Sequence, residues 1–392
     1  MKFGSNRVLV GALALTIVSL LGAAPAVQAR PQRTAQESSG QKPLMAEEAF
    51  KNVQLLRGIS VKEFMETMGF FAAATGMNCT DCHVTESGGD WSKYADDIPI
   101  KQKARMMMLM MNAINKTYFA GNRQVTCYSC HRGGRSPKVI PNLKEQYSIP
   151  AQDDPDQILE QAEGAPSADQ VLDKYIQAVG GAQRLATITS LIGKGTYQGY
   201  DDPGKLPIEV YAQAPGQVAQ IVHGAGGDSS WIDDGRSVWV AQPDTDAPVP
   251  VLALTAGDLD GAHVEAALFF PGRVKQLLTK WRVGIPLTED DQVFTEVQGT
   301  TAGGNNVKLY FDPSSGLLMR MVRYTNLPVG LIPTQIDYAD YRDVSGIKIP
   351  FRVTKTWVDG RSITEFSEVR PNTQIDATRF VKPATPVAPA IQ

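Results

Sequence analysis

The four cysteines of this 392-residue chain lie in two copies of one short motif, which constrains the fold more than any other feature. The motif is Cys-x-x-Cys-His, at residues 79–83 and again at residues 127–131. This spacing is typical of covalent haem attachment, in which both thiols form thioethers with the porphyrin and the next histidine ligates iron. The sequence therefore predicts two covalently bound haem c groups. The residues expected to hold them are Cys79, Cys82, His83, Cys127, Cys130 and His131.

Zinc and disulfides are the alternative uses of two cysteine pairs. A zinc ribbon usually separates its pairs by about 15–20 residues, whereas 44 residues separate Cys82 from Cys127 here. Two disulfides would suit an exported chain. Neither alternative uses a histidine directly after each pair, so haem attachment is favoured.

The first 29 residues have the pattern of an export signal. Lys2 and Arg7 form a charged start, residues 8–24 are apolar, and Val27-Gln28-Ala29 offers a small-residue cleavage site. We expect an exported, periplasmic protein, with membrane association through this segment as the alternative if it is not cleaved. The net charge of −3 provides no basic excess for binding nucleic acid.

An internal duplication organises residues 44–140, the predicted cytochrome domain. Ser60 and Glu63 form a capping box that opens a helix ending near Thr75, with Gly76 as its left-handed terminator. Pro99 begins a second amphipathic helix that ends at Gly121. Each helix is followed within a few residues by a cysteine pair, so the unit of helix, turn and attachment motif occurs twice.

The remainder of the chain has a different period. Residues 30–43 are expected to form a flexible leader, residues 141–166 a linker, and residues 167–385 a β-rich domain that begins with a helix capped by Ser167. We also expect a helix over residues 263–281. The predicted strands are Leu206–Ala212, Gln217–Val222, Ser237–Ala241, Val307–Phe311, Leu317–Tyr324, Ile336–Tyr341, Phe351–Val358 and Ile363–Val369. The fold class is α+β, with an all-α two-haem domain followed by a curved antiparallel sheet covered by helices.

Each haem iron needs a sixth ligand, and methionine sulfur is the usual one in electron carriers. Met65 and Met68 lie on the apolar face of the first predicted helix, and Met107 and Met111 on that of the second. Methionine on such a face often serves only as core filler. Periodicity does not choose within either pair.

The sequence around both motifs resembles the cytochrome subunit of purple-bacterial photosynthetic reaction centres. The resemblance covers about residues 50–140, through Val53-Gln54-Leu55-Leu56, Phe64-Met65-Glu66-Thr67-Met68, Ala104-Arg105-Met106-Met107, Ala113-Ile114-Asn115 and Val125-Thr126-Cys127-Tyr128-Ser129-Cys130-His131-Arg132-Gly133. It implies that Met68 and Met107 are the axial ligands. Members of that family usually carry four haems and a histidine in the loop before the second motif. This chain has cysteines for two haems and no histidine in residues 119–124.

The C-terminal half weakly resembles exported lipoprotein-carrier-like domains. The resemblance rests on two turn-containing segments, residues 309–318 and 341–346. It implies a curved sheet whose concave face holds a lipid or another apolar ligand.

Together these features predict an exported two-haem cytochrome that carries single electrons and is not an enzyme. Its expected partners are redox donor and acceptor proteins, including a membrane-bound complex. The alternatives are a haem enzyme with one open iron site and a redox-linked lipid- or partner-binding protein. Further candidates are aromatic cover for the haems (Trp91, Tyr94, Tyr118), cations for haem propionates (Arg132, Arg135, Lys138) and two histidines expected to be structural (His223, His263).

Overall fold

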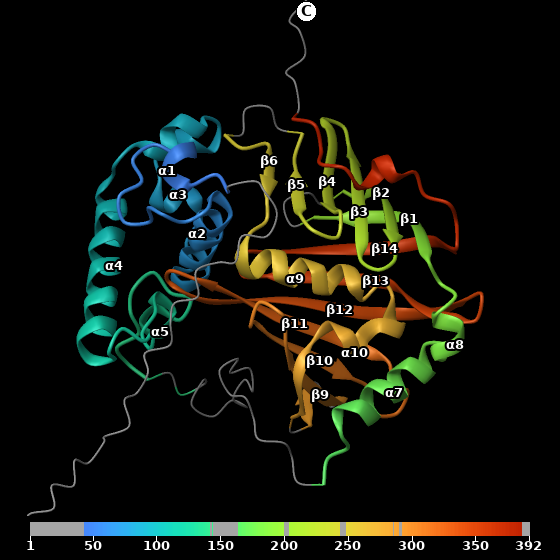
Figure 1. The fold of residues 1–392 in the computed structure, drawn as a ribbon. Coiled ribbons are helices and arrows are strands. Elements are labelled where there is room, and N and C mark those ends of the chain that lie inside the picture. The colour runs from blue at the N-terminus through green and yellow to red at the C-terminus, as the bar shows by residue number, and fades with distance from the viewer. Residues whose placement is uncertain are drawn as a thin grey trace, which may run out of the picture. The chain divides into compact units, whose positions relative to one another are not determined.

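A computed structural model describes residues 43–141, 143, 164–199, 204–243, 248–284, 286–289 and 292–385 (Figure 1). The predicted signal segment, and nearly all of the predicted leader and linker, lie outside these residues. No helix in the described ranges combines the length and apolar character needed to cross a membrane.

Residues 43–141, here called the helical region, contain helices and a single short bridge between Met45 and Ser60. The α-helices are α1 (Ala46–Ala49), α2 (Val61–Thr75), α3 (Cys79–Cys82), α4 (Pro99–Tyr118) and α5 (Cys127–His131). Two 3₁₀ turns, η1 (Thr85–Gly88) and η2 (Trp91–Ala95), lie between α3 and α4.

Both long helices begin where the sequence predicts; α2 also ends as predicted, whereas α4 ends at Tyr118, three residues before the predicted Gly121. The Ser60 side chain accepts a hydrogen bond from the Glu63 backbone N–H, and the Glu63 carboxylate accepts one from the Ser60 N–H, so two otherwise unpaired donors at the start of α2 are satisfied. Gly76 ends α2 with φ +65°. Pro99 is the first residue of α4, where its missing N–H costs nothing.

Residues 164–385, here called the β-rich region, form a mixed helical and antiparallel structure. Its helices are α7 (Ala168–Ala178), α8 (Ala182–Leu185), α9 (Ala256–Ala267), η3 (Pro271–Arg273), α10 (Val274–Leu277) and η4 (Ala377–Phe380). Its strands are β1 (Ser190–Gln198), β2 (Leu206–Gln213), β3 (Gln217–Gly224), β4 (Gly227–Asp233), β5 (Val238–Ala241), β6 (Val251–Ala253), β7 (Thr279–Val283), β8 (Leu287–Glu289), β9 (Gln292–Thr300), β10 (Asn306–Phe311), β11 (Leu318–Leu327), β12 (Gly330–Val344), β13 (Ile347–Trp357) and β14 (Gly360–Pro371).

The strands form one antiparallel sheet built from two meanders. Its order is β6-β5-β4-β3-β2-β1-β14-β13-β12-β11-β10-β9-β7, with β8 paired to β9. The first strand, β1, pairs with the last, β14, with Leu191 opposite Pro371. This long-range pairing joins the two meanders. All eight predicted strands are present, whereas β1, β4 and β6–β9 were not expected.

The predicted helix over residues 263–281 is wrong in its bounds. Helix α9 begins earlier, at Ala256, and ends at Ala267. Pro271 starts a 3₁₀ turn, because proline favours the first helical position and cannot continue the preceding helix. Trp281 lies in strand β7 rather than in a helix.

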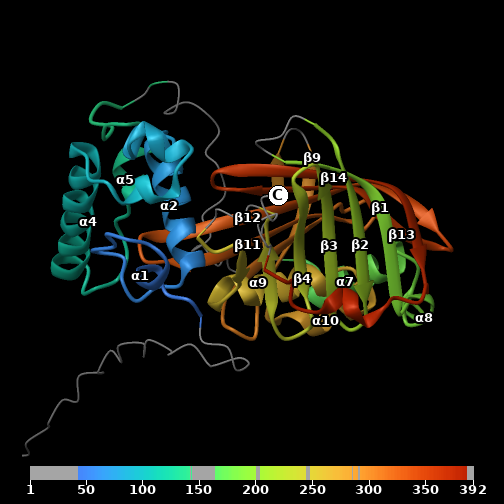
Figure 2. The same cartoon turned by 90° about the horizontal axis from the view of Figure 1, so that it is seen from above.

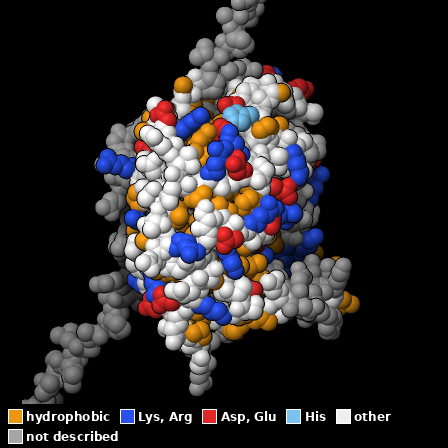
Figure 3. All heavy atoms as spheres, turned by 90° about the vertical axis from the view of Figure 1, so that its right-hand side faces the viewer, with side chains coloured by type: hydrophobic (Ala, Val, Ile, Leu, Met, Phe, Trp, Pro, Cys, Tyr) orange, Lys and Arg blue, Asp and Glu red, His pale blue; other side chains and the backbone are white. Residues whose placement is uncertain are grey.

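Helices α7, α9 and α10 cover one face of the sheet, and the strands wrap around them (Figure 2). Leu172 and Tyr175 of α7 pack with Val274 of α10 against Leu309 and Phe311 of β10. The concave face of the sheet is therefore filled by side chains of its own helices. On the side of the molecule shown in Figure 3, acidic and basic side chains are interspersed.

The hairpin between β11 and β12 packs into the core of the helical region. Leu327, Val329 and Ile332 are at most 3% exposed and cluster with Phe70 of α2 and Met111 of α4. Burial of one such side chain contributes about 1.5–3 kcal/mol. The helical region therefore shares its hydrophobic core with the β-rich region.

Candidate haem-attachment sites

Each cysteine motif folds as a single capped helical turn. The Asn78 side chain accepts from the Asp81 N–H at the start of α3, and the Thr126 side chain accepts from the Ser129 N–H at the start of α5. Residues three apart in a helix lie on the same side, so each turn presents its two thiols together. All four cysteines are free thiols at partly or fully exposed positions.

The histidine of each motif has one ring nitrogen engaged by the backbone. His83 Nδ1 lies 3.1 Å from the Tyr94 carbonyl oxygen, and His131 Nδ1 lies 3.0 Å from that of Gly134. A carbonyl oxygen only accepts hydrogen bonds, so Nδ1 carries the proton in both rings. The unprotonated Nε2 is then the atom available to a metal, as in histidine ligands whose second nitrogen is fixed by a backbone carbonyl.

The surroundings of His83 favour its neutral form. The Tyr94 ring meets the imidazole edge-on at 4.9 Å between centroids, and Trp91 lies 5.3 Å from Tyr94. Burial, followed by the positive charge of Lys101, lowers the pKa of His83. Neutral imidazole is the form that ligates iron. Two of the three predicted aromatic residues thus lie beside the first motif, whereas Tyr118 is 77% exposed.

The candidate methionines differ in burial. Met108 and Met111 are 7% and 5% exposed and belong to the shared core, so Met111 acts as core filler. Met107 is half-buried. In α2, Met65 is 40% exposed, whereas Met68 is half-buried and packs against the shared core.

Helix α2 also contacts the segment that follows the second motif. The Gly133 N–H donates to the Ala74 carbonyl at 2.9 Å. A Cβ at Gly76 would lie 2.5 Å from the Gly133 carbonyl oxygen, so only glycine permits this approach. The two duplicated units are therefore packed against each other through α2 and α5.

Asn115 fixes the loop before the second motif. Its buried side-chain amide donates to the Val125 carbonyl at 2.7 Å and accepts from the Val125 N–H at 2.9 Å. A polar residue on the otherwise apolar stripe, in the last turn of α4, is the sequence signal for such a role. Beyond the motif, the Lys138 N–H donates to the Cys130 carbonyl at 2.9 Å and folds the chain back over α5.

The two histidines outside the motifs each pair with an aspartate of the β-rich region. His223 Nδ1 lies 2.9 Å from Asp228, and His263 Nδ1 lies 2.9 Å from Asp233. Within the described residues, no group of three or more His, Cys, Asp or Glu side chains has the geometry of a metal site.

The helical region fits a bulky apolar prosthetic group. Thirteen of the fifteen large hydrophobic side chains exposed among the described residues lie between Leu44 and Leu143, and two lie in the β-rich region. Porphyrin rings would cover such side chains. Free thiols in pairs, imidazoles whose Nδ1 is held by a backbone carbonyl, and uncovered apolar surface together form a donor set and surroundings suited to haem c.

Known proteins match this part of the chain. Residues 19–167 match the family model of the photosynthetic reaction centre cytochrome C subunit. The chain is 39% identical over 110 residues to the photosynthetic reaction center cytochrome c subunit of Thermochromatium tepidum, and 37% identical over 99 residues to that of Rubrivivax gelatinosus. These matches cover 26% and 24% of this chain, and the chain spans about a quarter of the length of these relatives.

Solved structures similar to the chain include two at low identity. One is a LolA superfamily protein from Nitrosomonas europaea, with 14% identity, coverage of 56% of this chain and 99% of that one, and a TM-score of 0.38. The other is a DUF1329 family protein from Desulfovibrio piger, with 9% identity, coverage of 55% and 98%, and a TM-score of 0.39. The N-terminal part of the chain, residues 19–167, is therefore similar to the photosynthetic reaction centre cytochrome C subunit family.

Proposed function

We propose that the protein is an exported c-type cytochrome that carries single electrons on two haems between redox partners. Cys79 and Cys82 would hold one haem covalently, and Cys127 and Cys130 the other. The observation that supports this most strongly is the orientation of His83 and His131, because both rings keep Nε2 free while a backbone carbonyl holds Nδ1.

Met68 and Met107 are proposed as the second axial ligands. Both are half-buried, whereas Met108 and Met111 are buried members of the shared core; Met68 packs against that core without being enclosed in it. Bound haem would supply a one-electron Fe(III)/Fe(II) couple, and thioether ligation favours the ferrous state. The chain's own residues then fix the imidazoles, shield the rings and keep both axial positions filled, which suits transfer without a bound substrate.

Intact-mass analysis tests haem attachment. Protein matured in a host that ligates haem should retain the mass of two haems after denaturation. Replacement of Cys127 and Cys130 by alanine should leave the mass of one. A protein that retains no haem mass under these conditions would contradict the proposal.

The identity of the axial ligands needs a separate experiment. Met68→His or Met107→His should lower the reduction potential of one haem while that haem stays low-spin, because imidazole stabilises ferric iron more than thioether does. Carbon monoxide added to the reduced wild-type protein should bind neither iron. Rapid binding would instead favour the alternative of a haem enzyme with an open site.

The β-rich region is proposed to act as a carrier-like module for a lipid or another apolar ligand. Its curved sheet has an apolar inner face, which α7, α9 and α10 now occupy. A ligand would have to displace these helices from the sheet. Stabilisation of the β-rich region by acyl-chain ligands in a thermal unfolding assay would support this role, and unchanged unfolding would oppose it.

A further inference from the structure

Helix α2, which contains Met68, is held in place by charged and packing contacts from the β-rich region. We propose that Asp258 of α9 is a positioning residue: it holds α2 so that the sulfur of Met68 stays at bonding distance from a haem iron. This inference rests on the proposed function, because it assumes that Met68 is an axial ligand.

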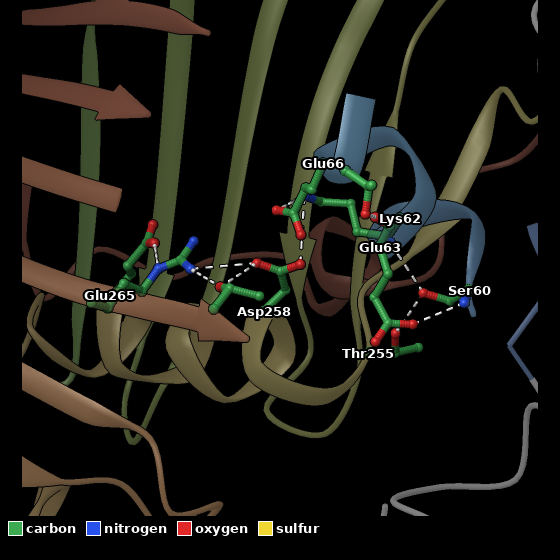
Figure 4. Close-up of polar contacts among 10 residues, drawn as sticks. Ser60, Lys62, Glu63, Glu66, Thr255, Asp258 and Glu265 are labelled. Atoms are coloured by element: carbon green, nitrogen blue, oxygen red, sulfur yellow. Dashed lines mark hydrogen bonds and ion pairs between the residues drawn. The ribbon is translucent and has the colours of Figure 1, made fainter. Parts of the chain in front are cut away.

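The direct contact joins α2 to the first turn of α9. Lys62 Nζ lies 3.5 Å from Asp258 Oδ2 and also pairs with Glu66 on the next turn of α2. Figure 4 shows Lys62 and Glu66 pointing from α2 toward Asp258. The Asp258 side chain is 3% exposed, so this contact lies in an environment where water screens charge weakly.

Asp258 is itself fixed from the sheet side. Its Oδ1 accepts from the Thr325 hydroxyl at 3.1 Å and lies 3.4 Å from Arg323 Nη1. Arg323 Nε donates to Glu265 at 2.7 Å, and Lys355 Nζ donates to the other oxygen of Glu265, also at 2.7 Å. Strands β11 and β13 thus hold α9, and α9 presents a rigid carboxylate to α2.

Two further contacts place α2 on the same surface. The Thr255 hydroxyl donates to the Ser60 side chain at 3.2 Å, at the N-terminus of α2. Gly330 of the β11–β12 hairpin faces Phe70, and a Cβ at this glycine would lie 2.6 Å from the Phe70 ring. Contacts with the β-rich region therefore hold α2 both before Met68, at Ser60, and after it, at Phe70.

The physical consequence follows from the helix geometry. Met68 lies six residues after Lys62, or about 9 Å along the axis. A thioether is a neutral and weak ligand, and its bond to iron depends on sulfur being held at bonding distance. Loss of the Asp258 anchor should therefore loosen the methionine–iron bond without removing haem.

The experiment compares full-length holoproteins by spectroelectrochemical titration and by the methionine–ferric iron charge-transfer band. Asp258→Asn keeps the shape of the side chain and removes its charge. We expect a weaker charge-transfer band, a lower potential for one haem and an unchanged potential for the other. Lys62→Gln should have the same effect. The double variant should change the band and the potential little more than either single variant does, because both substitutions break the same Lys62–Asp258 contact.

The matched control is Asp337→Asn in β12, which breaks the 2.6 Å pair with Arg320 of β11, the strand that also carries Arg323 and Thr325. It should leave both potentials unchanged. Gly330→Ala displaces α2 without altering any charge, and it should also weaken the band. It provides the test if Asp258→Asn does not fold.

Two results would overturn the inference. One is a raised potential with an intact charge-transfer band, because removal of a negative charge acting only through space favours ferrous iron. The other is no change in either quantity. Failure of the proposed function is seen separately, as absence of covalent haem or as a Met68→His variant with unaltered potentials.

Discussion

The helical region and the β-rich region differ in how completely they bury their apolar side chains. The β-rich region covers its apolar side chains with its own sheet and helices, and only Val293 and Val381 are large, hydrophobic and exposed among its described residues. The helical region leaves twelve such side chains exposed, and Leu327, Val329 and Ile332 of the other region complete its core. A polypeptide that leaves so much apolar surface open relies on a partner, and haem is the partner proposed for it.

Loss of a haem should therefore affect the helical region most. The Cys79→Ala/Cys82→Ala double variant should carry one haem and show faster hydrogen exchange in α2 and α4, with strands β1–β3 unaffected. Intact mass and exchange mass spectrometry measure the two effects. His223→Gln in the β-rich region is the control and should retain both haems. Equal exchange in the helices of both proteins would show that haem is not part of the core.

Truncation of a hairpin side chain that completes the helical core should have the next largest effect. Leu327 is 1% exposed, and Leu327→Ala should lower the free energy of unfolding by about 2–5 kcal/mol. The change should appear in denaturant unfolding followed by haem absorbance, which reports on the helical region. Val293→Ala, at a site 46% exposed, should change the free energy by no more than about 0.5 kcal/mol. Similar effects of both variants would contradict a shared core.

The capping boxes of α2 and α7 allow a finer comparison. Ser60→Ala and Ser167→Ala each remove a helix N-cap, at a cost of about 1 kcal/mol. Ser60 also accepts from Thr255, so its replacement should cost about 1 kcal/mol more. Chemical unfolding of each variant measures the difference. Equal costs would mean that the Thr255 contact contributes nothing.

The smallest expected effect is a pH dependence of the β-rich region. Burial alone would lower the pKa of His263, but the hydrogen bond and negative charge of Asp233 raise it above its usual value. The stabilisation from this pair is complete below the unfolded pKa of about 6.5 and is lost as pH rises through the higher folded value.

Glu66 adds a slope of the same sign, because burial raises its pKa to about 8 in the folded protein. The contribution of His263 is therefore taken from the difference between wild type and His263→Gln over pH 6 to 9. The variant should lose less stability as pH rises. Parallel curves would rule out the His263–Asp233 pair as a source of the pH dependence.

Local signals in the sequence determined a large part of this structure. The Ser60 and Ser167 capping boxes, the left-handed Gly76 and the alternation of the eight expected strands each lie within a few residues, so they act before distant contacts form. Strand β9 was not predicted from the sequence, because polar residues occupy buried positions in it. Glu296 pairs with Lys308 at 3.3 Å, and Gln298 donates to Glu296. Such a strand does not show the usual contrast of apolar and exposed positions.

By itself, the sequence determined the two Cys-x-x-Cys-His motifs, the helices that precede them and the change of period at the β-rich region. Only the tertiary structure showed that Met111 is core while Met107 is half-buried, that a hairpin from beyond residue 320 completes the helical core, and that Asp258 faces Lys62. The physical reason is distance along the chain. A cap or a haem motif is complete within one or two turns, whereas a contact between residues 196 positions apart exists only once the sheet has fixed α9 against α2.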